Sequence, residues 1–191
     1  MANSKIIVVE GAQGAGKTTV TDFLRYSLSY TNLYRLCGTS DSTKTGFLKA
    51  KNMYETLLDY LEKLENLSIN LVFDRTFFTE ENYCRLGKKE YSFTEAYEHL
   101  LERFSKLDFE IYYITLYLEN EELYEERLER SGKAAFANSN FEVENSKSQQ
   151  KVYLEIAEEI KQKYSNINVL NIRTDRPLEE VKEEIRQKIG F

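Results

Sequence analysis

Residues 5–19 read KIIVVEGAQGAGKTT, and they decide how the rest of the chain is interpreted. They match the pattern Gly-x-x-x-x-Gly-Lys-Thr at Gly11, Gly16, Lys17 and Thr18. In this pattern the glycines let backbone N–H groups surround a phosphate chain, the lysine reaches the outer phosphates and the threonine hydroxyl ligates Mg²⁺. The candidate phosphate-binding residues are Gly11, Ala12, Gln13, Gly14, Ala15, Gly16, Lys17, Thr18 and Thr19.

The residues on either side of this loop support the interpretation. Residues 6–9 are consecutive apolar residues, which predict a strand buried on both faces. Apolar residues then recur at helical spacing over residues 17–30. A loop between a strand and a helix N-terminus presents unpaired N–H groups and the positive end of the helix dipole to an anion. A plain glycine-rich turn would need neither Lys17 nor Thr18.

The remaining sequence alternates apolar runs with amphipathic segments. Further strands are predicted at residues 33–37, 69–73, 109–118 and 167–172. Further helices are predicted at residues 47–64, 92–107, 121–130, about 141–164, and from Pro177 to the end of the chain. Ser92 and Glu95 resemble a capping box at the start of the second of these. Five strands alternating with helices predict an α/β fold with a parallel sheet covered on both faces, because parallel strands need crossover connections.

Composition limits the classes of protein and partner. The 191 residues are expected to form one domain with a sizeable core. The net charge of -6 argues against a nucleic-acid partner. No apolar run reaches the roughly 20 residues that span a bilayer, and no signal peptide is expected before the first strand. Cys37 and Cys84 have neither metal-site nor redox-motif spacing, which favours a reduced cytoplasmic setting with both side chains buried.

Asp74 and Arg75 are the second informative feature. They follow the buried-strand sequence of residues 69–73, so they are expected at the edge of the sheet where ligands bind. A carboxylate at this position can hold Mg²⁺, and an arginine can bind a phosphate with its planar guanidinium. The alternative is an ion pair in a solvent-exposed turn.

Glu10 is a further carboxylate at the same edge, immediately before the glycine-rich loop. It is interpreted equally well as a general base for a hydroxyl acceptor and as a hydrogen-bond partner that fixes the loop.

Arg127 and Arg130 lie three residues apart and share a face of a predicted helix. With Lys133 they form a basic cluster beside residues 131–140, a polar segment expected to move and to close over the phosphates. The same helix also carries several glutamates, so a surface of intrahelical salt bridges is the alternative.

Together these motifs resemble the thymidylate kinase and deoxynucleoside kinase superfamily of P-loop kinases. Residues 10–19 resemble the thymidylate kinase phosphate loop, Asp74-Arg75 the Asp-Arg motif after its third strand, and residues 127–130 with the following segment its lid. The resemblance covers essentially the whole chain. It implies a P-loop NTPase fold, with a five-stranded parallel sheet, helices on both faces and a lid at about residues 127–145.

The resemblance also implies roles. The family transfers the terminal phosphoryl group of ATP to a nucleoside monophosphate, so ATP and Mg²⁺ are the implied cofactors. The implied roles are ATP phosphate contact for Lys17, Mg²⁺ binding for Thr18 and Asp74, acceptor-phosphate binding for Arg75, and stabilisation of the transferring group for Arg127 and Arg130. Residues 173–176 match the region that lies against adenine.

The chain departs from the thymidylate kinase pattern at two places. Gln13 replaces an acidic loop residue that binds the sugar hydroxyl, and residues 37–41 replace an Arg-Glu-Pro motif. Residues 74–80 also resemble the Glu-Arg-Ser signature of deoxynucleoside kinases, whose base is a glutamate at the position of Glu10.

Three functions therefore stay open. The leading hypothesis is a nucleoside monophosphate kinase, most favoured for a deoxynucleotide such as dTMP. The second is a deoxynucleoside kinase with Glu10 as its base, and the third is an ATP-binding regulatory protein without transfer activity. The expected partner is a small nucleotide rather than nucleic acid or a membrane, and a homodimer stays open. The candidate acceptor-binding residues are Glu10, Gln13, Lys51, Tyr54 and Arg75, although Tyr54 fits the helix core equally well.

Overall fold

The computed structural model describes residues 4–130 and 142–191 of the chain. The strands are β1 (Lys5–Gly11), β2 (Thr31–Arg35), β3 (Asn70–Asp74), β4 (Glu110–Tyr117) and β5 (Ile167–Arg173). The helices are α1 (Lys17–Ser27), α2 (Lys44–Glu62), α3 (Phe77–Arg85), α4 (Thr94–Ser105), α5 (Leu123–Arg130), α6 (Val143–Lys163) and α7 (Leu178–Ile189).

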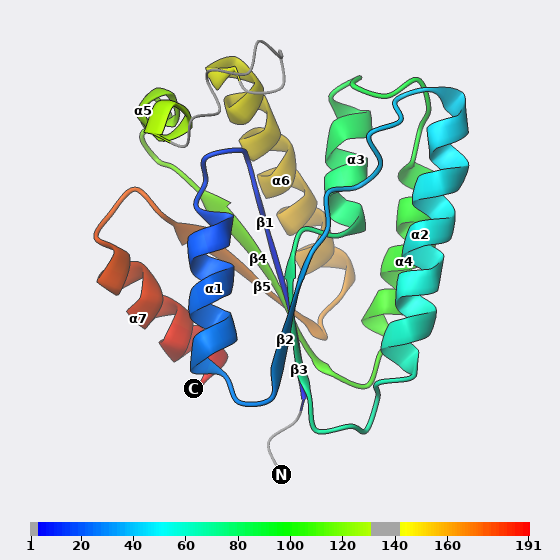
Figure 1. The fold of residues 1–191 in the computed structure, drawn as a ribbon, viewed down its shortest axis with the longest axis horizontal. Helices are drawn as coiled ribbons and strands as arrows, with labels where there is room; N and C mark the ends of the chain where they lie inside the picture. Colours follow the sequence, from blue (N-terminus) through cyan, green and yellow to red (C-terminus); the bar gives the residue numbers. More distant parts are fainter. Residues whose placement is uncertain (1–3, 131–141) are drawn as a thin grey trace.

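The five strands form one parallel sheet in the order β2-β3-β1-β4-β5 (Figure 1). β1 lies at its centre, where Val9 pairs with Asp74 of β3 and Gly11 pairs with Leu116 of β4. The predicted α/β class and five-stranded parallel sheet are confirmed. Because all strands run the same way, their carboxyl ends meet at one edge of the sheet. The glycine-rich loop leaves β1 at this edge, Asp74 ends β3 there, and α5 follows the end of β4.

Helices cover both faces of the sheet (Figure 1). Ile6 and Val8 of β1 belong to an apolar cluster that includes side chains from α2, α3, α4 and α6. Ile7 and Val9 point to the opposite face and pack with α1 and α7. This alternation follows from the strand period of two, and it explains why residues 6–9 are continuously apolar.

Three expectations are corrected. The sequence predicted no helix at residues 77–85, where α3 lies. The predicted capping box at Ser92 is wrong, because α4 begins at Thr94 after Phe93, and no side-chain hydrogen bond caps it. The expectation that both cysteines are buried is wrong for Cys37, which is exposed, while Cys84 is half-buried. Among the described helices, none has the length and apolarity required to cross a membrane.

Candidate active site

The glycine-rich loop predicted to bind phosphate, residues 11–16, joins β1 to α1 and is called the phosphate loop below. Gly11, Gly14 and Gly16 have φ angles of 149°, 85° and 97°, which favour glycine because side chains are strained there. A Cβ atom on Gly11 would lie 2.7 Å from the carbonyl oxygen of Leu116, so the loop packs directly on the backbone of β4. Gly16 precedes the first residue of α1, which places the loop at the positive end of that helix.

Lys17 opens α1 and turns its ammonium group back over the loop. Its Nζ donates hydrogen bonds to the carbonyl oxygens of Gly11 at 2.6 Å and Ala12 at 2.7 Å. Thr18 and Thr19 follow as exposed residues at the helix N-terminus. The cation and the hydroxyl-bearing residues that the motif predicts are therefore adjacent to the loop.

A cavity of about 480 Å³ opens beside the phosphate loop. Gly14, Gly16, Thr18, Thr19 and Val20 line one side, and Thr174, Leu178 and Val181 line the other. Five cationic residues also line the cavity, namely Lys17, Arg75, Arg127, Arg130 and Arg176. The described lining includes no carboxylate. In a chain of net charge -6, this concentration of positive charge suits a polyanion of small-molecule size.

Arg127 and Arg130 of α5 both line this cavity but differ in their surroundings. Arg127 is half-buried and donates through Nη1 to Gly14 O at 3.2 Å and through Nη2 to Thr174 O at 2.6 Å. Burial and the neighbouring Arg130 charge lower the pKa of Arg127. Arg130 is exposed. Lys133 and residues 131–141 of the predicted lid lie outside the described residues, so the lid and its expected movement stay predictions.

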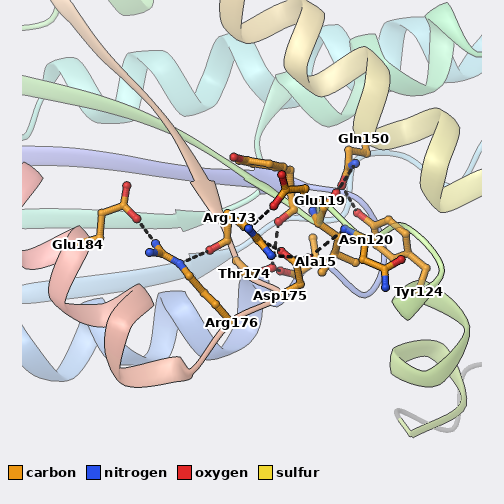
Figure 2. Close-up of polar contacts among 12 residues, drawn as sticks. Ala15, Glu119, Asn120, Tyr124, Gln150, Arg173, Thr174, Asp175, Arg176 and Glu184 are labelled. Carbon is orange, nitrogen blue, oxygen red and sulfur yellow. Dashed lines mark hydrogen bonds and ion pairs between the residues drawn. The ribbon is translucent and has the colours of Figure 1, made fainter.

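The loop between β5 and α7 closes the other side of the cavity. Figure 2 shows the Thr174 side chain directed to Ala15 of the phosphate loop, and Thr174 Oγ1 donates to Ala15 O at 2.8 Å. Arg176, from the same loop, lines the cavity, and its Nε donates to Arg173 O at 3.0 Å. Arg173 instead pairs with Asp175, with 2.8 Å between Nε and Oδ1. Of the predicted adenine-facing segment, Thr174 and Arg176 line the cavity.

Arg75 stands between this cavity and a second, smaller one. It is a non-glycine residue with a φ angle of 73°, and its N–H donates to Val9 O at 3.2 Å. Such a conformation costs energy, and it is retained where the surrounding structure enforces it. Arg75 lines both cavities and is therefore shared between them. This position does not fit the alternative of an isolated ion pair in an exposed turn.

The second cavity, of about 20 Å³, lies between the phosphate loop, α3 and α6. Its described lining is Gly11, Gln13, Lys17, Cys37, Arg75, Thr79, Tyr83, Gln149 and Tyr153. The Gln13 N–H donates to Oε1 of Gln149 at 3.1 Å, which ties the loop to α6. This orients the Gln149 amide, whose buried Nε2 has no hydrogen-bond partner within the described ranges.

Glu10 is fully buried, and both of its carboxylate oxygens accept hydrogen bonds. The Thr76 N–H donates to Oε1 at 2.8 Å, and the Thr79 hydroxyl donates to Oε2 at 2.8 Å. Burial raises the pKa of Glu10 to about 7. The carboxylate thus fixes the segment before α3 rather than the phosphate loop, a variant of the structural role expected from the sequence.

Asp74 and Thr18 have the chemistry to hold Mg²⁺. Asp74 is 6% exposed, and its Oδ1 lacks a hydrogen-bond partner among the described residues, while Oδ2 lies 3.8 Å from Arg35 Nε. A buried carboxylate oxygen without a partner is costly and fits a cation ligand. Mg²⁺ is commonly bound by one or two protein oxygens and substrate phosphates, so a larger protein cluster is not required. Within the described ranges, no group of three His, Cys, Asp or Glu residues could hold a metal.

Lys51 and Tyr54 of α2 differ from the other candidate residues. Tyr54 is fully buried, and its hydroxyl donates to Thr76 O at 3.1 Å. The structure thus gives Tyr54 the core position that the sequence had allowed. Lys51 lies on the helix surface, with Nζ 3.8 Å from Oε1 of Glu55.

Thr174 and Gln149 were not singled out from the sequence. Both act through backbone groups of the phosphate loop, which are far away along the chain. A threonine after a strand and a glutamine in a helix carry no local signal for such contacts. Only the position of residues 173–176 after the last strand could have pointed to Thr174.

No protein-family model matches the sequence, and no curated protein matches it. Solved structures match its fold along nearly the whole chain. Thymidylate kinase from Candida albicans has a TM-score of 0.68 and 15% identity, covering 98% of this chain and 91% of that chain. Thymidylate kinase from Ehrlichia chaffeensis has a TM-score of 0.63 and 15% identity, covering 98% and 100%.

Deoxyadenosine kinase from M. mycoides, in a structure with the products dCMP and a flexible dCDP bound, has a TM-score of 0.61 and 20% identity. That comparison covers 97% of this chain and 98% of the kinase. The chain therefore has the fold of thymidylate and deoxyadenosine kinases, which confirms the P-loop kinase fold expected from the motifs.

Proposed function

We propose that this chain is a Mg²⁺-dependent kinase that transfers the terminal phosphoryl group of ATP to a nucleoside monophosphate, with a deoxynucleotide such as dTMP as the favoured acceptor. The observation that carries the proposal is the position of Arg75, which lines both the large cationic cavity and the smaller cavity beside it. A phosphate on each side of one guanidinium is the arrangement that transfer between two nucleotides requires.

The large cavity is the proposed ATP site. Its phosphate-loop side offers backbone N–H groups, Lys17 and the α1 N-terminus, whereas Leu178 and Val181 supply apolar surface on the opposite side. A ligand with a polyanionic end and a flat apolar ring matches this division. The cations Lys17, Arg75, Arg130 and Arg176 neutralise the triphosphate and the charge that spreads over the transferring group.

Transfer needs little covalent help from the protein. An oxygen of the acceptor phosphate attacks the γ-phosphorus, the bond to the β-bridging oxygen breaks, and ADP leaves. The acceptor oxygen is already ionised, so no protein base has to remove a proton. Lys17, Arg75 and Arg130 are the proposed charge-stabilising residues. Thr18 and Asp74 are the proposed ligands of Mg²⁺, which supplies further neutralisation of phosphate charge when bound.

The burial of Glu10 favours a phosphate acceptor over a hydroxyl acceptor. A general base must reach the proton that it removes, and both Glu10 oxygens already accept hydrogen bonds from the segment around α3. One observation favours the second candidate, a deoxynucleoside kinase: the Glu10 pKa of about 7 is suited to proton transfer near neutral pH.

The test is a coupled ADP-release assay with ATP, Mg²⁺ and a panel of deoxynucleosides and their monophosphates. We expect turnover with a monophosphate, retention of that activity in Glu10→Gln, and a loss of about 100-fold or more in Lys17→Ala and Arg75→Ala. The variant Lys106→Ala, at a side chain 70% exposed that lines neither cavity, is the control and should keep wild-type kinetics.

Two outcomes would replace this proposal. Turnover of a deoxynucleoside alone, abolished in Glu10→Gln, would establish the second candidate. Binding of ATP without transfer to any acceptor would favour the regulatory protein without transfer activity.

A further inference from the structure

Thr174 lies where three parts of the proposed ATP site meet. Its N–H donates to Tyr117 O at 2.9 Å, which holds it at the end of β4. Its hydroxyl donates to Ala15 O at 2.8 Å, with Tyr117 O as a longer second acceptor at 3.3 Å. The residue is 8% exposed, so these polar groups are largely shielded from water. The Thr174 hydroxyl thereby attaches the β5–α7 loop directly to the phosphate loop (Figure 2).

Arg127 joins the same two loops from the side of α5. Its Nη1 donates to Gly14 O and to Thr174 Oγ1, both at 3.2 Å, and its Nη2 donates to Thr174 O at 2.6 Å. Hydrogen bonds from a charged donor are stronger than neutral ones, and a planar guanidinium fixes the direction of each. Arg127 therefore directs donors to the protein backbone, whereas Arg130, on the same helix face, is exposed along the cavity.

The β5–α7 loop leads to the apolar part of the cavity. After Thr174 come Arg176 on the loop, Leu178 at the start of α7 and Val181 one turn later, and all of them line the cavity. Phosphate groups gain nothing from Leu178 and Val181, but the ring of a nucleoside does. The hydrogen bonds of Thr174 and Arg127 hold the β5–α7 loop against the phosphate loop. They therefore set the distance between the phosphate-loop backbone and this apolar surface.

On the premise of the proposed ATP site, we propose that Thr174 and Arg127 form a clasp that positions the apolar end of the cavity against the phosphate loop. The clasp lets the nucleoside end of ATP contribute to binding. Within the pair on α5, Arg127 is a positioning residue and Arg130 is the one that contacts phosphate.

Affinities for ATP and for inorganic tripolyphosphate, both with Mg²⁺, test this division. Tripolyphosphate keeps the charges of ATP but has no nucleoside. In Thr174→Val and in Arg127→Met we expect affinity for ATP to fall about tenfold, the effect of losing a hydrogen bond of a charged group, and affinity for tripolyphosphate to change less than about threefold. In Arg130→Met both affinities should fall by a similar factor.

Conservative and surface variants serve as controls. Thr174→Ser keeps the hydroxyl and should bind ATP within about twofold of wild type, because the stabilising contacts come from the oxygen and the backbone. Glu125→Gln, an exposed change on α5, should leave both affinities unchanged. If Thr174→Val does not fold, Arg127→Met tests the clasp from its other side.

The possible results of these binding measurements separate the clasp inference from the kinase proposal. Equal losses of ATP and tripolyphosphate affinity in the clasp variants, or no loss in either, would overturn the inference while leaving the kinase proposal intact. ATP binding with the expected pattern but no transfer would contradict the kinase proposal and support the clasp. Wild-type protein that binds neither ligand would overturn both.

Discussion

The hydroxyl of Thr79 on α3 donates a 2.8 Å hydrogen bond to the buried carboxylate of Glu10 at the end of β1. The Thr76 N–H donates to the other carboxylate oxygen, so one side chain joins the central strand to the start of α3. Burial raises the pKa of this carboxyl from 4.5 to about 7. The connection is therefore sensitive to pH in the neutral range.

Stability should depend on pH through Glu10. Between pH 4.5 and 7 the folded protein holds a proton that the unfolded chain releases, so the free energy of unfolding falls as pH rises through this window. The shift corresponds to at most about 3 kcal/mol. Glu10→Gln removes the titrating group, and urea unfolding at several pH values should give a flatter profile than wild type.

The exposed variant Glu125→Gln should retain the wild-type pH dependence. Parallel profiles for Glu10→Gln and wild type would show that the carboxyl titrates normally in the folded protein.

Gly11→Ala should destabilise the protein more than Gly87→Ala. Both glycines have positive φ angles, 149° and 67°, so both substitutions introduce backbone strain, which is larger at Gly11 because its φ angle lies outside the left-handed helical region. A Cβ at Gly11 would also lie 2.7 Å from the backbone oxygen of Leu116, while nothing lies within 4 Å at Gly87. Thermal unfolding should show an additional loss of about 1–3 kcal/mol for Gly11→Ala. Equal losses of stability in the two variants would mean that the backbone of β4 moves away from the added Cβ atom at no cost in free energy.

Tyr54→Phe should affect stability rather than acceptor binding. The lost hydroxyl donates to Thr76 O in the core, and its removal should cost about 1 kcal/mol in urea unfolding. The acceptor KM should stay within about twofold of wild type, because one core hydrogen bond has no direct effect on the ligand. A KM raised tenfold at unchanged stability would restore Tyr54 as an acceptor-binding residue.

Lys89→Met should be strongly destabilising. Lys89 and Glu80 form a buried ion pair of 3.2 Å, with side chains 7% and 1% exposed. Removing the lysine leaves Glu80 with the Thr39 N–H and the Tyr91 hydroxyl as donors, at a cost of about 3 kcal/mol. The double variant Lys89→Met, Glu80→Gln should lose less than the sum of the single losses, measured by urea unfolding. Additive losses would indicate no coupling.

The sequence was most informative where structure is local. The strands follow apolar runs such as residues 6–9, and all five lie within a few residues of their predicted positions. The phosphate loop was predictable because a backbone motif requires glycine, lysine and threonine at fixed spacing.

Helix α3 was not predictable because its buried face is largely polar. Thr79, Glu80, Glu81 and Asn82 are all buried, and most of their partners lie outside this helix, Arg85 being the exception. Glu80 pairs with Lys89, and Glu81 accepts from Arg85 at 2.8 Å and Thr94 at 3.0 Å. A search for apolar periodicity cannot detect a helix whose buried positions are satisfied by such tertiary contacts.

The central position of β1 has a consequence for biosynthesis. This strand leaves the ribosome before the rest of the sheet, but its neighbours are β3 at residues 70–74 and β4 at residues 110–117. Until both have been translated, an apolar segment with two unpaired edges stays exposed, and such segments readily associate with other nascent chains. Completion of the sheet therefore depends on distant partners, and we expect slow folding and a need for chaperone protection during translation.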